Sequence, residues 1–393
     1  MNYSDIRRQL GLDSMKKYDE TLAYITHYLQ NQGHEAANNY QGVATDHLNG
    51  INPNNITWDI PFPPPANPNF TFIDLFAGIG GMRLAFQNLG GKCLFSSEWD
   101  SHAQKTYEYN YGEVPFGDIT QIDENMIPDH DVLVAGFPCQ AFSIAGRRGG
   151  FEDTRGTLFF DVARIIRAKR PRAIFLENVK GLVSHDRGRT LEVILNTLRE
   201  DLGYYVPEPQ IMNARDFGVP QHRERIFIVG FHPDTGVTEF NYPEPTGTDI
   251  RFIDIREENE VSVKYYLSTV YIQTLRDHKA RHEAKGNGFG YNIVPDDGIA
   301  NALVVGGMGR ERNLVIDDRL TNFTPVTHIK GEVNREGIRK MTPREWARLQ
   351  GFPDNFRIEV SDVQAYKQFG NSVAVPAVQA TANEIINSIL VEV

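Results

Sequence analysis

Cys139 has the sequence setting of a nucleophile. It lies in the segment GFPCQ, residues 136–140, directly after the apolar run 132–135. A cysteine that follows a short strand, between Pro and Gln instead of apolar residues, is a candidate for covalent catalysis. The alternative is a small buried hydrophobic residue, which is the commonest fate of a free cysteine. Cys93, inside an apolar run of its own, fits that alternative, and Cys139 fits it poorly.

Charged residues stand next to two further apolar runs. Glu177 follows the run 174–176. A carboxyl group at the end of a buried strand tends to have a raised pKa and can act as a general acid. Arg223 and Arg225 precede another apolar run and are two residues apart, so that both face the same side of a strand. Two guanidinium groups near a cleft can lower the pKa of a thiol and hold a phosphate. The alternative is that Arg223 and Arg225 only form ion pairs with Glu224 at the start of the strand.

The segment DLFAGIGG, residues 74–81, predicts a cofactor turn between a strand and a helix. Glycines such as Gly78 and Gly80 let the backbone turn tightly and approach a bound ligand. Glu98 follows Gly78 by twenty residues, where a carboxylate can accept hydrogen bonds from ribose hydroxyls. Trp99 comes next and can pack on an adenine ring. The pattern predicts a cofactor that contains adenosine.

The spacing of these glycines favours S-adenosylmethionine over a dinucleotide. The dinucleotide pattern Gly-x-Gly-x-x-Gly fails because the third position after Gly80 is Arg83. A cradle for a pyrophosphate is therefore disfavoured, although the turn alone does not separate the two cofactors. The alternative without any ligand is a glycine-rich turn that only packs a helix on a strand.

Strands and helices alternate from Phe70 onward. In the helix predicted at 342–349, Thr342 is a good N-cap and Glu345 completes a capping box. The alternation predicts an α/β fold, a Rossmann-like doubly wound mixed sheet with ligand sites at the carboxyl ends of its strands. Short apolar runs predict strands at 70–76, 93–97, 132–135, 173–176 and 226–231, and helical spacing predicts helices at 82–89, 103–109, 158–168, 190–202 and 342–349.

Composition divides the chain into five segments. Residues 1–60 are expected to be an N-terminal helical extension without identifiable chemistry, and residues 61–69 a Pro-rich linker. Residues 70–261 form the predicted catalytic and cofactor-binding domain. Residues 262–335 mix glycine-rich segments with basic residues and show little periodicity, which predicts a small irregular domain. Residues 336–393 then return to the catalytic domain.

The charge is distributed unevenly along the chain. The 393 residues include 40 Lys and Arg against 51 Asp and Glu, a net charge of −11 that by itself argues against a nucleic-acid partner. Residues 262–350, however, hold 14 Lys and Arg against 10 Asp and Glu, a net charge of +4. This local excess suits a polyanionic backbone.

Composition and spacing also exclude several classes of protein and site. The two cysteines cannot form a disulfide framework or a multi-cysteine metal site. Residues 1–10 have no apolar signal core and no stretch has the length of a membrane span, so we expect a cytoplasmic protein without a membrane contact. His278 and His282 stand four apart on a predicted helix, but they lack a third ligand and have Arg281 and Lys285 beside them. We therefore expect no metal.

Six motifs in this order resemble the DNA (cytosine-5)-methyltransferase family. They are FAGIGG, GFPCQAFS, ENV, QHRERIFIVGF, RKMTPREWARLQGFP and YKQFGNSVAVP, and the resemblance covers roughly residues 70–385. The segments KGNGFGY at 285–291 and GGMGRER at 306–312 are further similar to bacterial restriction–modification methylases that act on CCGG.

The resemblance implies an enzyme that transfers a methyl group from S-adenosylmethionine to C5 of a flipped-out cytosine in duplex DNA. The target would be the inner cytosine of CCGG, and the reaction would pass through a covalent bond between Cys139 and C6, with S-adenosylhomocysteine as product. The protein would be the modification half of a restriction–modification system. It would be a bacterial, cytoplasmic monomer that associates with the nucleoid through DNA, and its cognate endonuclease would act on the same site without needing contact.

The resemblance also assigns roles to single residues. Cys139 would attack C6, Glu177 would contact N3 and the exocyclic amine, and Arg223 and Arg225 would orient the base and the cysteine. Residues 262–335 would form the target-recognition domain. The cofactor contacts would be Phe76, Gly78, Gly80, Glu98, Trp99, Asp118, Ile119, Leu158, Asn371 and Ser372. The DNA contacts would be Gln140, Ser143, Arg147, Arg148, Arg310 and Arg312.

The chain departs from the family pattern at two positions. Many members have a Thr-Leu pair where this chain has Ala302 and Leu303, and Ala145 stands where relatives often have Ser. With Ala302 in place of threonine, this chain lacks the contact that the threonine of other members makes to the DNA backbone. Methylation of RNA, a catalytically silent DNA-binding regulator and an NAD-type oxidoreductase are the alternatives. The last of these leaves Cys139 and the basic region without a role.

Overall fold

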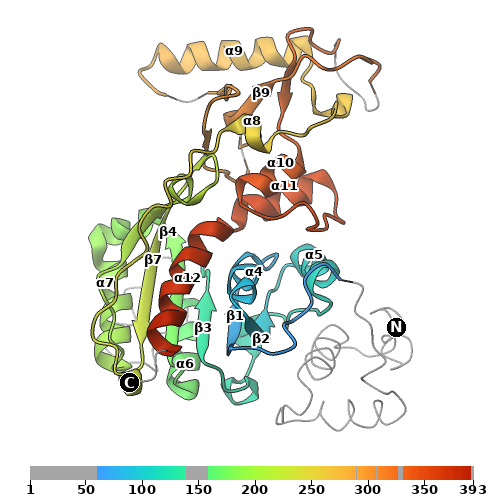
Figure 1. Cartoon of the computed structure of the whole chain (residues 1–393). Helices are drawn as coiled ribbons and strands as arrows, with labels where there is room; N and C mark the ends of the chain where they lie inside the picture. The colour runs from blue at the N-terminus through green and yellow to red at the C-terminus, as the bar shows by residue number, and fades with distance from the viewer. Residues whose placement is uncertain (1–59, 139–157, 289, 307–308, 326–330, 391–393) are drawn as a thin grey trace, which may run out of the picture.

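A six-stranded mixed sheet forms the centre of the larger part of the molecule (Figure 1). The computed structural model describes residues 60–138, 158–288, 290–306, 309–325 and 331–390. The strand order is β2-β1-β3-β4-β7-β5, and β7 runs antiparallel between β4 and β5, whereas β1 to β4 are mutually parallel. The expected doubly wound mixed sheet is confirmed. The strands are β1 (Phe70–Leu75), β2 (Gly91–Ser97), β3 (Val132–Ala135), β4 (Ala173–Val179), β5 (Gln210–Asn213) and β7 (Glu224–Phe231).

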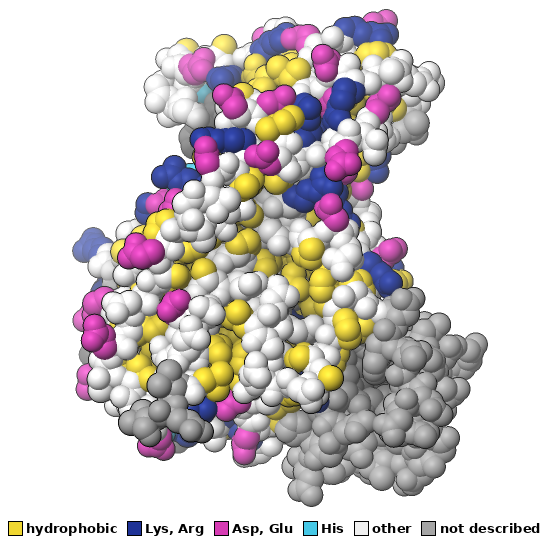
Figure 2. Space-filling view, viewed as in Figure 1, with side chains coloured by type: hydrophobic (Ala, Val, Ile, Leu, Met, Phe, Trp, Pro, Cys, Tyr) yellow, Lys and Arg dark blue, Asp and Glu magenta, His cyan; other side chains and the backbone are white. Residues whose placement is uncertain are grey.

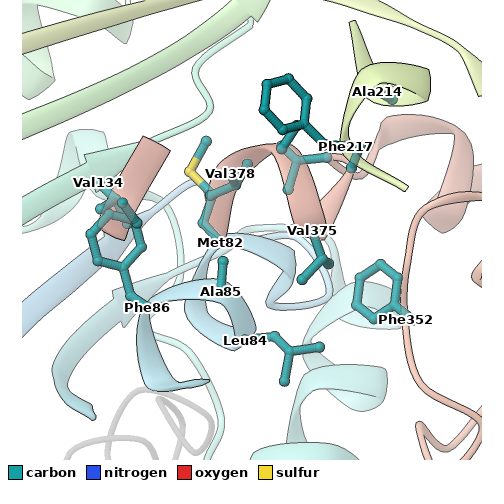
Figure 3. Close-up of a cluster of buried hydrophobic side chains, with 14 of the residues drawn as sticks. Met82, Leu84, Ala85, Phe86, Val134, Ala214, Phe217, Phe352, Val375 and Val378 are labelled. Carbon is teal, nitrogen blue, oxygen red and sulfur yellow. The ribbon is translucent and has the colours of Figure 1, made fainter. Parts of the chain in front are cut away.

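Helices cover both faces of this sheet, because side chains of its strands alternate between two apolar cores. In β1, Phe72 faces one core, whereas Ile73 and Leu75 face the other. The first core packs against α4 and α12, and Figure 3 shows Met82 of α4 beside Val378 of α12. The second packs against α6 and α7. The helices are α4 (Gly81–Asn88), α5 (Ser101–Tyr111), α6 (Leu158–Lys169), α7 (Arg189–Asn196), α11 (Asp362–Asn371) and α12 (Val375–Leu390).

The observed elements differ from the predicted ones at several ends, and some, such as α11 and α12, were not predicted. Strand β5 was not predicted, because two of its four residues are exposed and it forms no apolar run. The helix expected over 190–202 ends at Asn196 and continues as a π turn over Thr197–Asp201. Strand β4 extends past its apolar run to Val179. The capping box is as predicted, since Thr342 Oγ1 accepts from the amide of Glu345 at 3.1 Å.

The smaller part of the molecule, above the sheet in Figure 1, has its own apolar clusters. It is more regular than its sequence indicates, because α9 (Thr269–Glu283) is a helix of fifteen residues. Only Ile272 and Leu275 of this helix are buried, and so short an apolar stripe gives a weak periodic signal. The other elements are α8 (Phe252–Ile255), β9 (Leu314–Ile316) and β10 (Ile338–Lys340), with β8 (Ala300–Asn301) paired to β6 (Gln221–His222) below.

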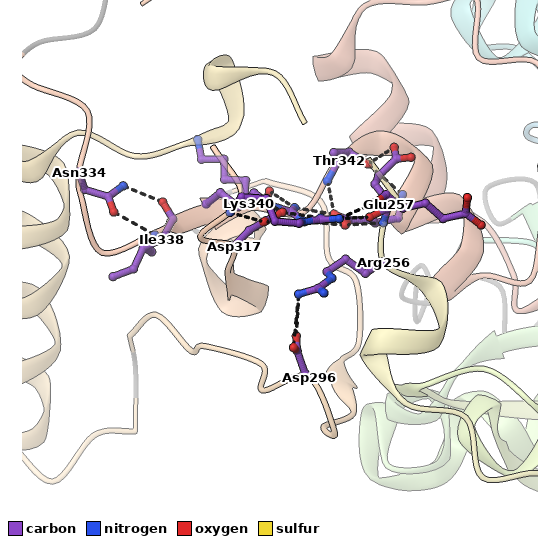
Figure 4. Close-up of polar contacts among 12 residues, drawn as sticks. Arg256, Glu257, Asp296, Asp317, Asn334, Ile338, Lys340 and Thr342 are labelled. Atoms are coloured by element: carbon purple, nitrogen blue, oxygen red, sulfur yellow. Dashed lines mark hydrogen bonds and ion pairs between the residues drawn. The ribbon is translucent and has the colours of Figure 1, made fainter. Parts of the chain in front are cut away.

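A buried arginine, Arg339, joins the smaller part to α10 (Pro343–Leu349). Figure 4 labels Asp317, Glu257 and Thr342, which belong to the same network of polar contacts. The guanidinium of Arg339 on β10 donates to Asp317 at 2.9 Å and to both oxygens of Glu345 at 2.7 and 2.8 Å. All three side chains are fully buried. Glu345 also accepts from the amide of Glu257, and Glu257 accepts from Thr342. The orientation of the β9–β10 hairpin on α10 is therefore fixed by charge-assisted hydrogen bonds.

We predict that Arg339→Met lowers the free energy of unfolding by about 3–5 kcal/mol, because it leaves the buried Glu345 without its ion-pair partner and leaves the buried Asp317 with Arg319 alone. Urea denaturation at neutral pH measures the change. Arg276→Met is the control, since the ion pair of Arg276 with Glu336 is exposed and should contribute less than about 1 kcal/mol. If the two substitutions lowered the free energy of unfolding equally, burial of the ion pairs of Arg339 would not account for their effect.

Candidate functional site

A cavity of about 670 Å³ lies at the carboxyl ends of the parallel strands. Its walls come from the loops after β1, β2, β3 and β4, from the start of β7, and from the end of α11. This is the position that a doubly wound sheet offers to a ligand. Segments that are 300 residues apart in the sequence, such as those of Asp74 and Ser372, share one cavity.

The glycine-rich turn after β1 and the carboxylate of Glu98 form one end of the cavity. The amide of Gly78 donates to Glu98 Oε2 at 2.8 Å, and the amide of Asp100 donates to Oε1 at 2.7 Å. These bonds fix the carboxylate beside the turn and oppose the effect of burial, which raises the pKa of Glu98. The turn needs the left-handed conformation of Gly78, whose φ is 56°.

Gly80 and Arg83 have structural roles behind the turn. Gly80 does not line the cavity, and a Cβ there would lie 2.3 Å from the ring of Tyr111. The side chain of Arg83 is fully buried, pairs with Glu113 and lies over the ring of Tyr111 at 4.5 Å. The position that breaks the dinucleotide pattern is thus occupied by an ion-paired side chain that points away from the ligand space.

Nine of the ten predicted cofactor residues line the cavity, all except Gly80. Trp99 is 79% exposed, which is unusual for so large an apolar side chain and leaves its ring free to cover a ligand. Asp74 also lines the cavity and was not singled out from the sequence; burial raises its pKa to about 8. Its carboxyl and that of Glu98 are both buried and line the cavity beside the glycine-rich turn.

Glu177, Arg223 and Arg225 meet at the other end of the cavity. Arg225 Nε lies 3.0 Å from Glu177 Oε1. Burial raises the pKa of Glu177, and the charges of Arg225 and Arg223 oppose that rise. Glu224 points elsewhere and pairs with Lys180 at 2.8 Å, so the alternative of an ion-paired strand entry does not describe these two arginines.

The loop that carries the predicted nucleophile enters the cavity from β3. Phe137 and Pro138 line the cavity, and Asn178 Nδ2 donates to the carbonyl of Phe137 at 2.8 Å. Asn178 follows Glu177 directly, so one strand end positions both a carboxyl group and the start of this loop. Five predicted site residues lie outside the described residues: Cys139, Gln140, Ser143, Arg147 and Arg148.

Arg223 joins three parts of the chain at the edge of the cavity. Its guanidinium donates to the carbonyls of Leu303, Gly370 and Ser372 at 3.0, 3.1 and 2.6 Å. Gln221 adds to this junction: it donates to the carbonyl of Leu349 and accepts from the amide of Leu303.

Gln350 completes the junction and was missed from the sequence. It donates to the carbonyls of Phe369 and Ser372 at 2.6 and 3.1 Å. Glutamine at the end of a predicted helix gives no distinct signal, because its partners are backbone atoms whose place only the fold decides.

The predicted base-reading arginines lie away from the cavity, in the smaller part of the molecule. Arg310 lies over the ring of Tyr366, 5.5 Å from its centre, and Arg312 is exposed. Both belong to a 3-10 turn over Arg310–Asn313. His278 and His282 of α9 have ring centres 4.4 Å apart, and no group of three metal-ligating side chains occurs in the described ranges.

Comparison with known proteins gives one consistent result. The family model for C-5 cytosine-specific DNA methylase matches residues 70–387. The chain is 72% identical to the type II methyltransferase M.HpaII of Haemophilus parainfluenzae over 334 residues. This aligned region covers 84% of this chain and 93% of that protein. It is 49% identical over 333 residues to the type II methyltransferase M.SsoII of Shigella sonnei, with 84% and 83% coverage. The crystal structure of the S. pombe Dnmt2 methyltransferase matches with a TM-score of 0.60 at 18% identity, over 81% of this chain and 98% of that chain, and so bears on the fold.

We predict that Arg225→Met makes stability more sensitive to pH. Without Arg225 the pKa of Glu177 will stand further above its unfolded value, so the folded protein holds the proton more tightly and loses stability as the pH rises from about 5 to 8. The extra loss is about 1.4 kcal/mol for each unit by which the pKa rises. Urea unfolding at both pH values measures it.

Lys180→Met is the matched control, because Lys180 is ion-paired with Glu224 near the surface. This substitution should leave the pH dependence close to that of the wild type. An unchanged pH dependence in Arg225→Met would show that the ion pair does not control the titration of Glu177.

Proposed function

Because the chain belongs to the C-5 cytosine-specific DNA methylase family, we propose that it methylates C5 of a flipped-out cytosine in duplex DNA with S-adenosylmethionine as the methyl donor. One observation carries the proposal: a single cavity holds the Glu98–Trp99 end and the Glu177–Arg225 end. Groups suited to an adenosine ligand and groups suited to proton transfer on a base therefore face the same space.

The residues present fit S-adenosylmethionine. Trp99 offers an exposed ring for the adenine, and Glu98 has a carboxylate held in place for ribose hydroxyls. Phe76, Asp118, Ile119, Leu158, Asn371 and Ser372 complete the proposed contacts. When bound, S-adenosylmethionine supplies an electrophilic methyl group to C5 of the base.

The chemistry of the base then explains the other residues. The thiolate of Cys139 adds to C6, Glu177 gives a proton to N3, and the electron pair of the C5–C6 double bond becomes available at C5. As C5 gains its methyl group, N3 returns its proton to the carboxylate of Glu177. Loss of the C5 proton to a base and elimination of the thiolate then restore the C5–C6 double bond. The raised pKa of Glu177 suits a proton donor, and Arg225 stabilises the carboxylate that remains.

A stacked base does not expose the face of its ring, so the cytosine has to leave the helix at a cost of about a few kcal/mol. The proposed target-recognition domain, residues 262–335, offers contacts to DNA that can offset this cost. Residues 262–350 carry a net charge of +4, and Figure 2 shows Lys and Arg side chains over this upper part and at the narrowing below it. Arg147 and Arg148 of the loop after Cys139 would add to the basic surface.

We further infer that the recognition sequence is CCGG and that the inner cytosine is the target. The support is the similarity of residues 285–291 and 306–312 to methylases of that specificity, together with the 72% identity to M.HpaII. The role in a restriction–modification system and the monomeric state are part of the same proposal. No described helix is long and apolar enough to cross a membrane.

The test of the proposal is transfer of a labelled methyl group from S-adenosylmethionine to duplexes with CCGG, CCWGG or GCGC. We expect transfer to CCGG alone, and none by Cys139→Ala, which should still bind the cofactor because its thiol is needed only for the base. A duplex with 5-fluorocytosine should trap the wild type covalently, since fluorine cannot leave as a proton does. Methyl transfer by Cys139→Ala would refute the covalent route. If the wild type methylated RNA and not DNA, RNA would be the substrate.

Arg310→Ala should reduce the preference for CCGG over a single-base variant by about tenfold or more, because a bidentate contact to guanine is worth about 1–3 kcal/mol. Competition between the two duplexes measures the preference. Arg276→Ala is the control, since the exposed guanidinium of Arg276 is paired with Glu336, and it should leave the preference unchanged. Equal weakening on all sequences, with a smaller salt dependence, would assign Arg310 to phosphate contact instead.

A further inference from the structure

Helix α5 presents a row of polar groups to the C-terminal part of the chain. His102, Thr106 and Asn110 follow one another at intervals of four residues. The carbonyl of His102 and the side chains of Thr106 and Asn110 therefore lie on one side of the helix. Thr106 and Asn110 are almost completely buried. Buried polar side chains in a helix need partners. Besides carbonyls four residues back on α5, Thr106 and Asn110 each have a partner more than 240 residues away in the sequence.

The partners of this row belong to α11 and the segment before it. Thr106 Oγ1 donates to Gln368 Oε1 at 2.9 Å, and Gln368 Nε2 donates to the carbonyl of His102 at 2.8 Å. Asn110 bonds both backbone groups of Arg357, at 2.8 and 3.0 Å. Lys367 Nζ donates to Asp100 Oδ2 at 2.5 Å, at the first residue before α5. We call these contacts the α5 seam.

The α5 seam lies directly beside the cofactor end of the cavity. Asp100 and Ala103 of the α5 region line the cavity, and so do Lys367, Gln368 and Asn371 of α11. Apolar contacts also join the two regions, but such contacts have no preferred direction. Hydrogen bonds are directional, so they decide how α11 is rotated and placed along α5. A shift by one residue would move the cavity wall by about 1.5 Å.

We propose that Gln368, through Thr106 and His102, is a positioning residue for S-adenosylmethionine. It holds the end of α11 at the distance from Trp99 and Glu98 that the cofactor needs. This inference rests on the proposed use of S-adenosylmethionine. Gln368 acts through α11 and is not a catalytic residue. The ion pair of Lys367 with Asp100 adds to the same fixation, but it is partly exposed and contributes less.

Thr106→Val tests the α5 seam with little change of shape, because valine replaces the hydroxyl by a methyl group. We expect the Kd for S-adenosylhomocysteine to rise about tenfold, since a buried amide oxygen loses its donor. The KM for S-adenosylmethionine should rise alike, and kcat and the KM for CCGG duplex should stay within about twofold, because the base-binding end is not touched. Thr106→Ser keeps the hydroxyl and should bind like the wild type.

Gln379→Leu is a matched control, because Gln379 accepts from Asn88 at 2.9 Å and so also joins an early helix to a late one, but away from the cavity. Its Kd should be unchanged. Calorimetry gives the affinity and urea unfolding gives the stability of each variant. A loss of stability in Thr106→Val with an unchanged Kd would overturn the positioning role. If the wild type itself binds no S-adenosylhomocysteine, the proposed cofactor fails instead.

Discussion

The arrangement of the site depends on the hydrogen bonds of one buried guanidinium. Arg223 precedes β7, and its donors meet carbonyls from the smaller part of the molecule and from the end of α11. A buried arginine has to find acceptors for its donors, and backbone carbonyls supply them to both terminal nitrogens of Arg223, whereas its Nε has no acceptor among the described residues. Three segments that are far apart in the sequence are thereby brought to one edge of the cavity.

The same principle recurs wherever parts of the chain have to keep a fixed relation. Arg83 pairs with Glu113 behind the cofactor turn, Arg225 pairs with Glu177 within the cavity, and Arg339 pairs with two carboxylates at the base of the smaller part. A buried ion pair adds little to net stability compared with an apolar pair, but a misplaced partner is costly. Such pairs therefore favour one arrangement over its alternatives.

The overall charge of −11 does not describe the surface that would meet DNA. The acidic residues predominate outside residues 262–350, and the basic excess lies within that range. At moderate salt, the electrostatic attraction between protein charges and DNA phosphates is screened over about 10 Å. The local charge of the surface that contacts DNA therefore decides the interaction. A net charge taken over the whole chain is therefore a poor guide to the partner.

The sequence by itself determined five of the six strands of the central sheet, several of the helices and the types of the site residues. Strand ends, glycine turns and caps are local, so β1, the turn at Gly78 and the capping box of Thr342 follow from neighbouring residues. The sequence did not predict β5, α11 or α12, and two of the four residues of β5 are exposed, so that it forms no apolar run. Only the tertiary structure decided that Gly80 serves packing, that Gln350 and Gln368 hold the cavity wall, and that Arg225 contacts Glu177. The physical reason is that these contacts join side chains to atoms many residues away, where no local pattern records the partner.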